Sequence, residues 1–394
     1  MRLCQDSSST PATARLILAD GTVLHGEGLG ATGAAVGELC FNTAMTGYQE
    51  ILTDPSYAGQ IVTFTFPHIG NTGVNDEDVE NASTSSSAAA RGAVLRATAT
   101  SPSNHRARLD LSAWMRRRGI IGVTGVDTRM LTARIREEGV MSAVVAHNAA
   151  GSFDEEALIR KAQDWPGLLG RDLAKGVATP SAFSATESDW RLAEGFGTGD
   201  PNGPHAVVID YGVKRNILRR LVGAGCRVSV VPAAASFDEI MAHEPDGVVL
   251  GNGPGDPAAT AEYAVPVIRK LLEAKVPLFG ICLGHQLLAL AVGARTMKMP
   301  QGHHGANHPV RDHATGKVEI VSMNHGFAVD EASLPDTVEA THTSLFDGTN
   351  AGLRLKNAPA VSVQHHPEAS PGPQDSFAVF ERFVETMRRE KAAA

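Results

Sequence analysis

Short apolar runs alternate with amphipathic stretches through the second half of the chain. The apolar runs predict buried strands at residues 206–210, 227–231, 247–250 and 276–281, and the amphipathic stretches predict helices at 216–222, 237–243 and 264–274. This alternation is typical of a parallel sheet covered by helices on both faces. We therefore expect an α/β protein whose C-terminal domain, residues 201–394, is a doubly wound, mainly parallel sheet. Ligands of such sheets bind at the carboxyl ends of the strands.

The first half has a less regular pattern. Two apolar runs flank Asp20 and Gly21 and predict a hairpin, residues 60–66 predict a strand, and residues 111–139 have a helical pattern. We expect a mixed α/β domain over residues 15–200, after a disordered tail at 1–14. A glycine- and proline-rich link at 194–204 marks the expected boundary between the domains. The serine-rich segment 81–90 predicts an exposed loop.

Composition narrows the class of protein. The chain has 394 residues, of which 43% are hydrophobic, which is enough for two domains with real cores. A net charge of -8 disfavours a nucleic-acid partner, and no apolar run is long enough to cross a bilayer. The four cysteines lack C-x-x-C spacing, so neither a disulfide framework nor a thiolate metal site is indicated. We expect a cytoplasmic protein without nucleic-acid or membrane partners.

The stretch around Cys282 carries the first candidate chemistry. Gly280 and Gly284 flank Cys282 with the spacing of a nucleophile elbow, in which a sharp strand-to-helix turn exposes the nucleophile. The following helix would direct its positive N-terminal end at the sulfur and favour the thiolate. A structural cysteine at a strand end fits the spacing about equally well.

A thiolate nucleophile needs a base, and the base needs a group that orients it. The apolar run 360–364 predicts a strand that leads into His365, His366 and Glu368, where a turn would bring the carboxylate to an imidazole. As an isolated motif, a surface His-Pro turn is the better interpretation. The catalytic interpretation is favoured here because a strand that ends at this motif would place it at the same edge of the sheet as the cysteine.

Two further segments suggest ligand binding. The glycine-rich turn 251–257 lacks the Gly-Lys-Ser/Thr of a phosphate loop and favours backbone N–H groups that stabilise an oxyanion, with the N–H of Leu283 as a second donor. A plain turn remains the alternative. The histidine-rich segment 302–313 resembles a metal cluster, yet it has no accompanying cysteine, helical H-x-x-x-H or nearby glutamate. We expect loop histidines there, and no metal or cofactor on this chain.

Together these motifs resemble the class I (triad) glutamine amidotransferase domain, because three separated motifs occur in the expected order over about residues 205–392. Segments 41–60, 67–73, 127–132 and 210–219 further resemble the small subunits of glutamine-dependent carbamoyl-phosphate synthases. The resemblance implies a nucleophile at Cys282 with His366 and Glu368 as its partners, which selects His366 over His365. It also implies a glutamine site near the domain junction, made of Ser56, Gly253, Gly255, Leu283, Gln286, Asn324, Gly326 and Phe327.

The same resemblance implies the partner and the overall reaction. The chain would release ammonia from L-glutamine through a cysteine thioester. It would pass the ammonia to a carbamoyl-phosphate synthase large subunit, to which the N-terminal domain binds. ATP and a divalent metal are expected on that large subunit, which would make carbamoyl phosphate from bicarbonate for pyrimidine and arginine biosynthesis.

Three alternatives remain from the sequence. A subunit serving anthranilate or GMP synthesis would share the triad but should lack the motifs of the first 200 residues. A regulatory or scaffolding subunit would keep the fold and lose the triad, whereas all three residue types are present. An esterase-like cysteine hydrolase would use the same elbow and turn over esters without hydrolysing glutamine.

Overall fold

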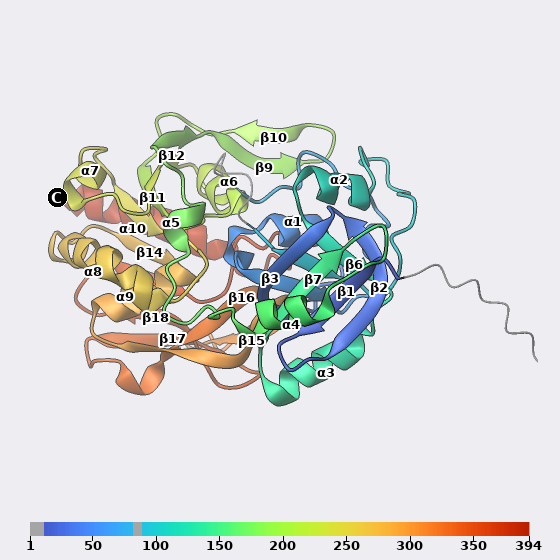
Figure 1. The fold of residues 1–394 in the computed structure, drawn as a ribbon. Helices are drawn as coiled ribbons and strands as arrows, with labels where there is room; N and C mark the ends of the chain where they lie inside the picture. The colour runs from blue at the N-terminus through green and yellow to red at the C-terminus, as the bar shows by residue number, and fades with distance from the viewer. Residues whose placement is uncertain (1–11, 82–88, 394) are drawn as a thin grey trace, which may run out of the picture. The chain divides into compact units, whose positions relative to one another are not determined.

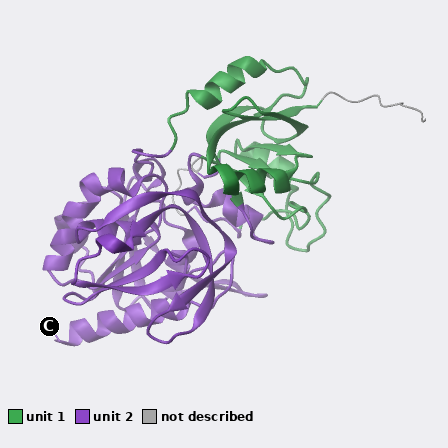
Figure 2. Ribbon diagram, turned by 90° about the horizontal axis from the view of Figure 1, so that it is seen from below, with its two compact units in different colours: residues 1–41, 60–76, 91–167 green, residues 42–59, 77–90, 168–394 purple. Residues whose placement is uncertain are grey.

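A computed structural model describes residues 12–81 and 89–393, so most of the predicted tail and of the serine-rich segment lies outside the described residues. The chain forms two compact units (Figure 2). Unit 1 contains residues 1–41, 60–76 and 91–167, and unit 2 contains residues 42–59, 77–90 and 168–394. The first half of the chain therefore contributes two segments, 42–59 and 77–90, to the unit that also holds Cys282.

Unit 1 is built on a closed barrel with the strand order β1-β2-β6-β5-β4-β3-β7. The predicted hairpin is confirmed, because β1 and β2 pair antiparallel with Ile17 opposite Val23. The strands of the barrel are β1 (Ala14–Leu18), β2 (Val23–Gly30), β3 (Gly33–Asn42), β4 (Gln60–Phe64), β5 (Gly92–Val94), β6 (Ile121–Thr124) and β7 (Met141–His147). Its helices are α2 (Leu111–Arg117), α3 (Thr128–Glu138) and α4 (Glu155–Gln163).

Unit 2 contains a ten-stranded sheet with the order β16-β15-β17-β18-β19-β14-β13-β11-β12-β8 (Figure 1). The five neighbours from β19 to β12 are parallel, as the apolar runs predict. These parallel strands are β11 (His205–Asp210), β12 (Arg227–Pro232), β13 (Gly247–Leu250), β14 (Leu278–Ile281) and β19 (Ala360–Val363). The antiparallel strands are β8 (Phe183–Ala185), β15 (Arg295–Asp312), β16 (Val318–Asp330), β17 (Val338–Ser344) and β18 (Asn350–Leu355).

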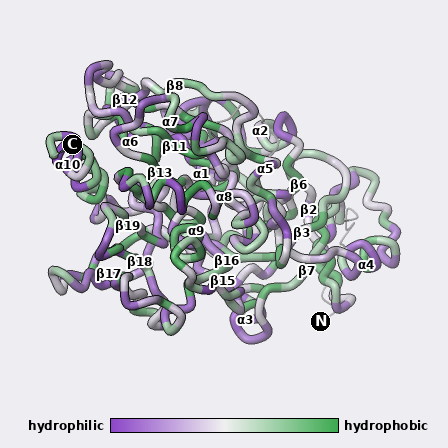
Figure 3. The backbone as a smooth tube through the Cα atoms, turned by 90° about the vertical axis from the view of Figure 1, so that its left-hand side faces the viewer, coloured by the Kyte–Doolittle hydropathy of each residue, from purple (hydrophilic) through white to green (hydrophobic). Residues whose placement is uncertain are grey.

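Helices cover both faces of the parallel strands, which confirms the predicted α/β class. One apolar cluster joins α8 and α9 to one face, and another joins α6 and α10 to the opposite face. All six residues of β11 are buried, and Figure 3 shows β11 and β13 as hydrophobic. The helices of unit 2 are α1 (Tyr48–Thr53), α5 (Ala174–Val177), α6 (Arg215–Gly223), α7 (Phe237–Met241), α8 (Pro257–Glu273), α9 (Leu283–Ala291) and α10 (Ala378–Ala393). Two 3₁₀ turns lie at Pro55–Tyr57 and Glu331–Ser333.

The structure differs from the sequence-based expectations at two places. The predicted histidine loop was wrong, because residues 302–313 continue β15 almost to their end and pair with β16 through two irregularities in register. This pairing depends on a partner strand that a local pattern does not reveal. Part of the predicted link also forms strand β10 (Gly195–Thr198), which pairs with β9 (Glu187–Arg191).

The turn from β14 into α9 is tightly packed around Cys282. Cys282 has a φ of 53°, in the left-handed region that a non-glycine residue rarely adopts. A Cβ atom at Gly280 would lie 2.7 Å from the carbonyl oxygen of Gly284, and one at Gly284 would lie 2.1 Å from the carbonyl oxygen of Leu250. Both glycines are therefore required by close approach of the backbone, as the elbow spacing predicts.

We expect Gly284→Ala to lower the free energy of unfolding by about 3 kcal/mol, because the added methyl group must displace backbone of β13. Urea denaturation followed by circular dichroism measures this loss. Gly176→Ala is the matched control, because a Cβ atom there meets no atom within 4 Å. Equal unfolding free energies for the two variants would contradict the close approach at Gly284.

Candidate active site

Cys282, His366 and Glu368 come together at the carboxyl ends of neighbouring parallel strands. Cys282 follows β14 and His366 follows β19, and these strands pair in parallel with Ile281 opposite Val363. Nδ1 of His366 lies 2.7 Å from Oε1 of Glu368, and all three side chains are buried. The Cys282 thiol donates to the carbonyl oxygen of Asn324 at 3.5 Å. Apart from its interaction with the Cys282 side chain, Nε2 of His366 has no hydrogen-bond partner, which leaves it available for a reacting group.

The electrostatics of this cluster favour an imidazolium at His366. Burial opposes a charge on the ring, yet Glu368 and Cys282 together raise the pKa of His366 to about 10. Burial likewise opposes the charge of Glu368, but Lys214 and His366 lower its pKa to about 2. The raised pKa of His366 and the lowered pKa of Glu368 are consistent, because the positive charge of one stabilises the negative charge of the other. His365 behaves differently, since burial lowers its pKa well below the usual value and its Nδ1 has no partner.

Lys214 completes this charged group, and sequence reasoning missed its role. Its side chain is 3% exposed, and Nζ donates to Oε1 of Glu368 at 2.8 Å and to the carbonyl oxygen of Ala369 at 2.7 Å. Burial would lower the pKa of Lys214, but Glu368, Glu80 and Asp54 raise it. Oε1 of Glu368 therefore accepts from both Lys214 and His366. The sequence offers no local sign that a lysine at the start of an amphipathic helix is buried.

Ser56 and Asn324, both predicted glutamine-binding residues, lie in one hydrogen-bonded network within unit 2. Oγ of Ser56 accepts from Nδ2 of Asn252 at 2.8 Å, and the N–H of Ser56 donates to Oδ1 of Asp54 at 2.8 Å. Oδ2 of Asp54 in turn accepts from Nδ2 of Asn324 at 2.9 Å. Ser56 thus belongs to the same compact unit as Cys282, although it precedes the predicted boundary by many residues. Sequence reasoning also missed Asp54 and Asn252.

Among the predicted glutamine-binding residues, Gly253 lies next to Leu283, the first residue after the elbow cysteine. A Cβ atom at Gly253 would lie 2.2 Å from the carbonyl oxygen of Tyr211 and 3.0 Å from the Leu283 side chain. Gly255 has a φ of 95°, and a Cβ atom there would lie 2.6 Å from the carbonyl oxygen of Arg171. Leu283 is the first residue of α9, where backbone N–H groups have no partner within the helix. These positions suit the binding of a negatively charged oxygen.

The remaining predicted residues lie on α9 and β16. Nε2 of Gln286 donates to the carbonyl oxygen of Phe327 at 2.7 Å and to Oε1 of Gln364 at 3.0 Å, so this side chain ties α9 to β16. Gly326 and Phe327 follow Asn324 on β16. These contacts link the helix after Cys282 to the strand whose Asn324 carbonyl accepts from the thiol.

The histidines of β15 and β16 are buried, and burial lowers the pKa of three of them, His304, His308 and His325. Burial lowers the pKa of His304 to about 4 and that of His308 to about 3. Nδ1 of His304 contacts Oδ1 of Asn324 at 2.8 Å, which orients the amide of that residue. Within residues 12–81 and 89–393, no three His, Cys, Asp or Glu side chains are grouped so that they can hold a metal ion.

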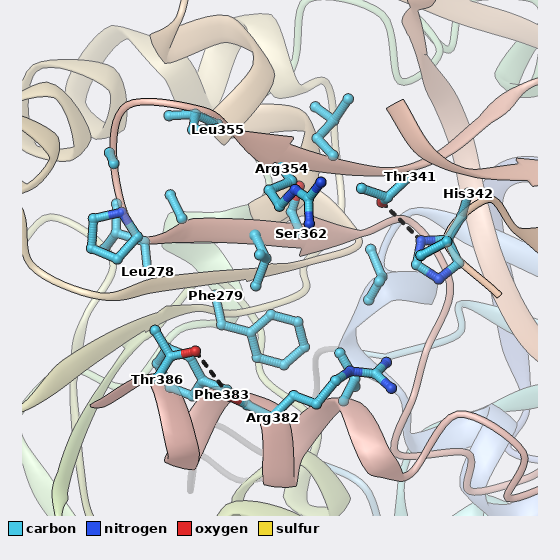
Figure 4. A pocket seen from close by; sticks show the side chains of 18 of the residues that line it. Leu278, Phe279, Thr341, His342, Arg354, Leu355, Ser362, Arg382, Phe383 and Thr386 are labelled. Carbon is cyan, nitrogen blue, oxygen red and sulfur yellow. Dashed lines mark hydrogen bonds between the residues drawn. The ribbon is translucent and has the colours of Figure 1, made fainter. Parts of the chain in front are cut away.

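A cavity of about 520 Å³ lies elsewhere in unit 2, between α10 and strands that include β18 and β19 (Figure 4). Its lining does not include Cys282, His366 or Glu368. Several of its polar groups are already paired: Arg354 contacts Glu339, Arg389 contacts Glu390, and Asp312 accepts from Ala314 and Thr315. The arrangement of reactive side chains, rather than the size of a cavity, therefore identifies the candidate site.

Among the helices that the structure describes, none is both long and apolar enough to cross a membrane.

Comparisons with known proteins agree with the two-part organisation. Residues 207–386 match the family model for class I glutamine amidotransferases, and residues 16–145 match the model for the carbamoyl-phosphate synthase small chain, CPSase domain. The chain is 61% identical to the carbamoyl phosphate synthase small chain of Brucella anthropi over 379 residues, which cover 96% of this chain and 93% of that protein. It is 61% identical to the small chain of Rhizobium meliloti over 392 residues, which cover 98% of each chain.

Family models for both halves and this degree of identity over nearly the whole length lead to one assignment. The chain belongs to the family of carbamoyl phosphate synthase small chains, with a class I glutamine amidotransferase domain.

Proposed function

We propose that this chain hydrolyses L-glutamine through a thioester on Cys282 and delivers the ammonia to a carbamoyl-phosphate synthase large subunit. The observation that carries the proposal is the buried contact of His366 with Glu368, next to a cysteine on a strained elbow. Family membership supports glutamine as the substrate and the large subunit as the partner. Ser56, Gly253, Gly255, Leu283, Gln286, Asn324, Gly326 and Phe327 are the residues proposed to bind glutamine.

In the first half of the reaction, the Cys282 thiolate attacks the carbon of the side-chain carboxamide. The N–H groups of Leu283 and Gly255 stabilise the oxyanion, an interaction for which one donor is typically worth about 3–4 kcal/mol. The C–N bond then breaks, the His366 imidazolium gives its proton to the departing nitrogen, and ammonia leaves. The γ-glutamyl group remains on sulfur as a thioester.

In the second half, neutral His366 removes a proton from water, and the hydroxide attacks the thioester carbon. The C–S bond breaks, glutamate leaves, and the proton on His366 restores the imidazolium–thiolate pair. Glu368 holds the imidazole in the orientation that presents Nε2 to the sulfur, and Lys214 holds Glu368.

The ammonia must reach the partner without meeting bulk water, where it would become non-nucleophilic ammonium at neutral pH. We propose that the large subunit carries the ATP and divalent-metal chemistry and forms carbamoyl phosphate from bicarbonate, for pyrimidine and arginine biosynthesis in the cytoplasm. This chain itself would need no cofactor.

The first test is Cys282→Ala in the complex with the large subunit. We expect carbamoyl phosphate synthesis from glutamine to vanish, because no thioester can form, whereas synthesis from added ammonium chloride continues at the wild-type rate. Product formation with each nitrogen source is measured on the same preparation. Loss of both activities in a folded, assembled complex would contradict the proposed division of labour.

The second test is the pH dependence of Glu368→Gln. The imidazolium of His366 is present at neutral pH and is lost as pH rises through its pKa of about 10, and Glu368 is the strongest group that raises this pKa. Removing the charge of Glu368 should therefore move the alkaline limb of kcat/KM for glutamine to lower pH by about one unit or more. An unchanged alkaline limb would show that Glu368 does not stabilise the imidazolium.

A further inference from the structure

The turn that follows Glu368 has an unfavourable backbone conformation. Ala369 has a φ of 57° and Ser370 a φ of 59°, so two consecutive non-glycine residues lie in the left-handed region. Such conformations persist only where the surrounding structure holds them. Nζ of Lys214 donates to the carbonyl oxygen of Ala369, and Oγ of Ser370 donates to Oε1 of Glu80. Glu80 is therefore one of the groups that hold this turn.

Glu80 also binds the start of helix α6. Its carbonyl oxygen accepts from the N–H of Arg215 at 2.8 Å, and its Oε2 accepts from the N–H of Asn216 at 3.1 Å. Nδ2 of Asn216 donates to the carbonyl oxygen of Glu368 at 2.6 Å. The first turn of α6 thus lies between the two glutamates, and Glu80 contacts the catalytic segment through both Ser370 and Asn216.

The charges around Glu80 connect it to the same site. Glu80 is 1% exposed, and burial raises its pKa, while Lys214, Ser370, Arg219 and Asn216 act in the opposite direction. Lys214 interacts with both Glu80 and Glu368. Another acidic group faces this position: burial, Asp78 and Glu80 raise the pKa of Glu50 to about 8, while Lys214 acts in the opposite direction. Without Glu80, the contacts that hold Ser370 and the N-terminus of α6 beside Glu368 would be lost.

We propose that Glu80 is a positioning residue for glutamine hydrolysis. By holding Ser370 and the N-terminus of α6, it fixes the turn that presents Glu368 to His366. This role rests on the proposed glutaminase function, and it assigns a task to the segment 77–90, which comes from the first half of the sequence and belongs to unit 2.

The test is Glu80→Gln in the full complex with the large subunit. We expect kcat for glutamine hydrolysis to fall about 10- to 100-fold, because a misplaced carboxylate orients the imidazole poorly. KM for glutamine should change little, and synthesis from ammonium chloride should stay at the wild-type rate. The alkaline limb of kcat/KM should also move to lower pH, because a weakened contact between Glu368 and His366 destabilises the imidazolium.

Glu77→Gln is the matched control, because it makes the same change at an exposed position of the same segment. Ser370→Ala removes one of the contacts of Glu80 without altering the buried carboxylate, and we expect a smaller fall in kcat. Glu80→Asp keeps the charge and should recover the alkaline limb of the wild type. Ser370→Ala and Glu80→Asp keep the proposal testable if Glu80→Gln does not fold.

Several outcomes would overturn the role of Glu80. One is a folded Glu80→Gln variant with the wild-type kcat and alkaline limb. A second is a fall in activity that is equally large with glutamine and with ammonium chloride. A third is a fall in kcat for glutamine hydrolysis that leaves the alkaline limb of kcat/KM unchanged. Either result would mean that Glu80 only stabilises the fold. If the variant does not fold, wild-type kcat in Ser370→Ala would overturn the role. A wild-type complex that uses ammonium chloride but not glutamine would instead refute the proposed function.

Discussion

The site depends on a buried row of charges in which Lys214 and His366 both lie within hydrogen-bonding distance of Glu368. Removing ions from water is costly, and a buried ion pair is retained only where geometry and additional hydrogen bonds compensate. Here one carboxylate oxygen accepts from both cations, at 2.8 Å from Lys214 and 2.7 Å from His366. The charge of Lys214 keeps Glu368 ionised, and ionised Glu368 keeps the proton on His366. The reactivity proposed for Cys282 would therefore depend on the pairing of Lys214 with Glu368, which acts on the sulfur through His366.

Much of the parallel sheet and of the elbow is predictable from the sequence, because local rules determine them. Residues 206–209 of β11 and 248–250 of β13 are uninterrupted apolar runs, and burial on both faces of a sheet favours such runs. A strand that turns this sharply into a helix requires small residues at positions such as Gly280 and Gly284. The spacing of these two glycines around Cys282 therefore predicts the elbow by itself. The proximity of His366 to Cys282 follows from the strand order, since β19 lies beside β14 in the sheet.

The parts that the sequence does not reveal depend on contacts between distant residues. Residues 302–313 contain glycine and proline and read as a loop, yet pairing with β16 makes them a strand. Lys214 reads as the solvated end of an amphipathic helix, but it is buried through contacts with residues distant in the sequence, among them Glu368 and Ala369. Asp54 and Glu80 read as ordinary acidic residues of loops. Their importance appears only when segments 42–59 and 77–90 join unit 2.

This arrangement means that the glutamine amidotransferase domain defined by sequence is not the complete catalytic unit. Residues 201–394 contain Cys282, His366, Glu368 and Lys214, but Asp54, which contacts Asn324, and Glu80, which contacts Ser370, lie outside this range. A compact unit that takes segments from the first half of the chain couples the folding of that half to the geometry of the site. Since Asp54 contacts Asn324, whose carbonyl oxygen accepts from Cys282, a displacement of segment 42–59 reaches the thiol through only two residues. These two segments are therefore physically suited to couple events elsewhere in the chain to glutamine hydrolysis.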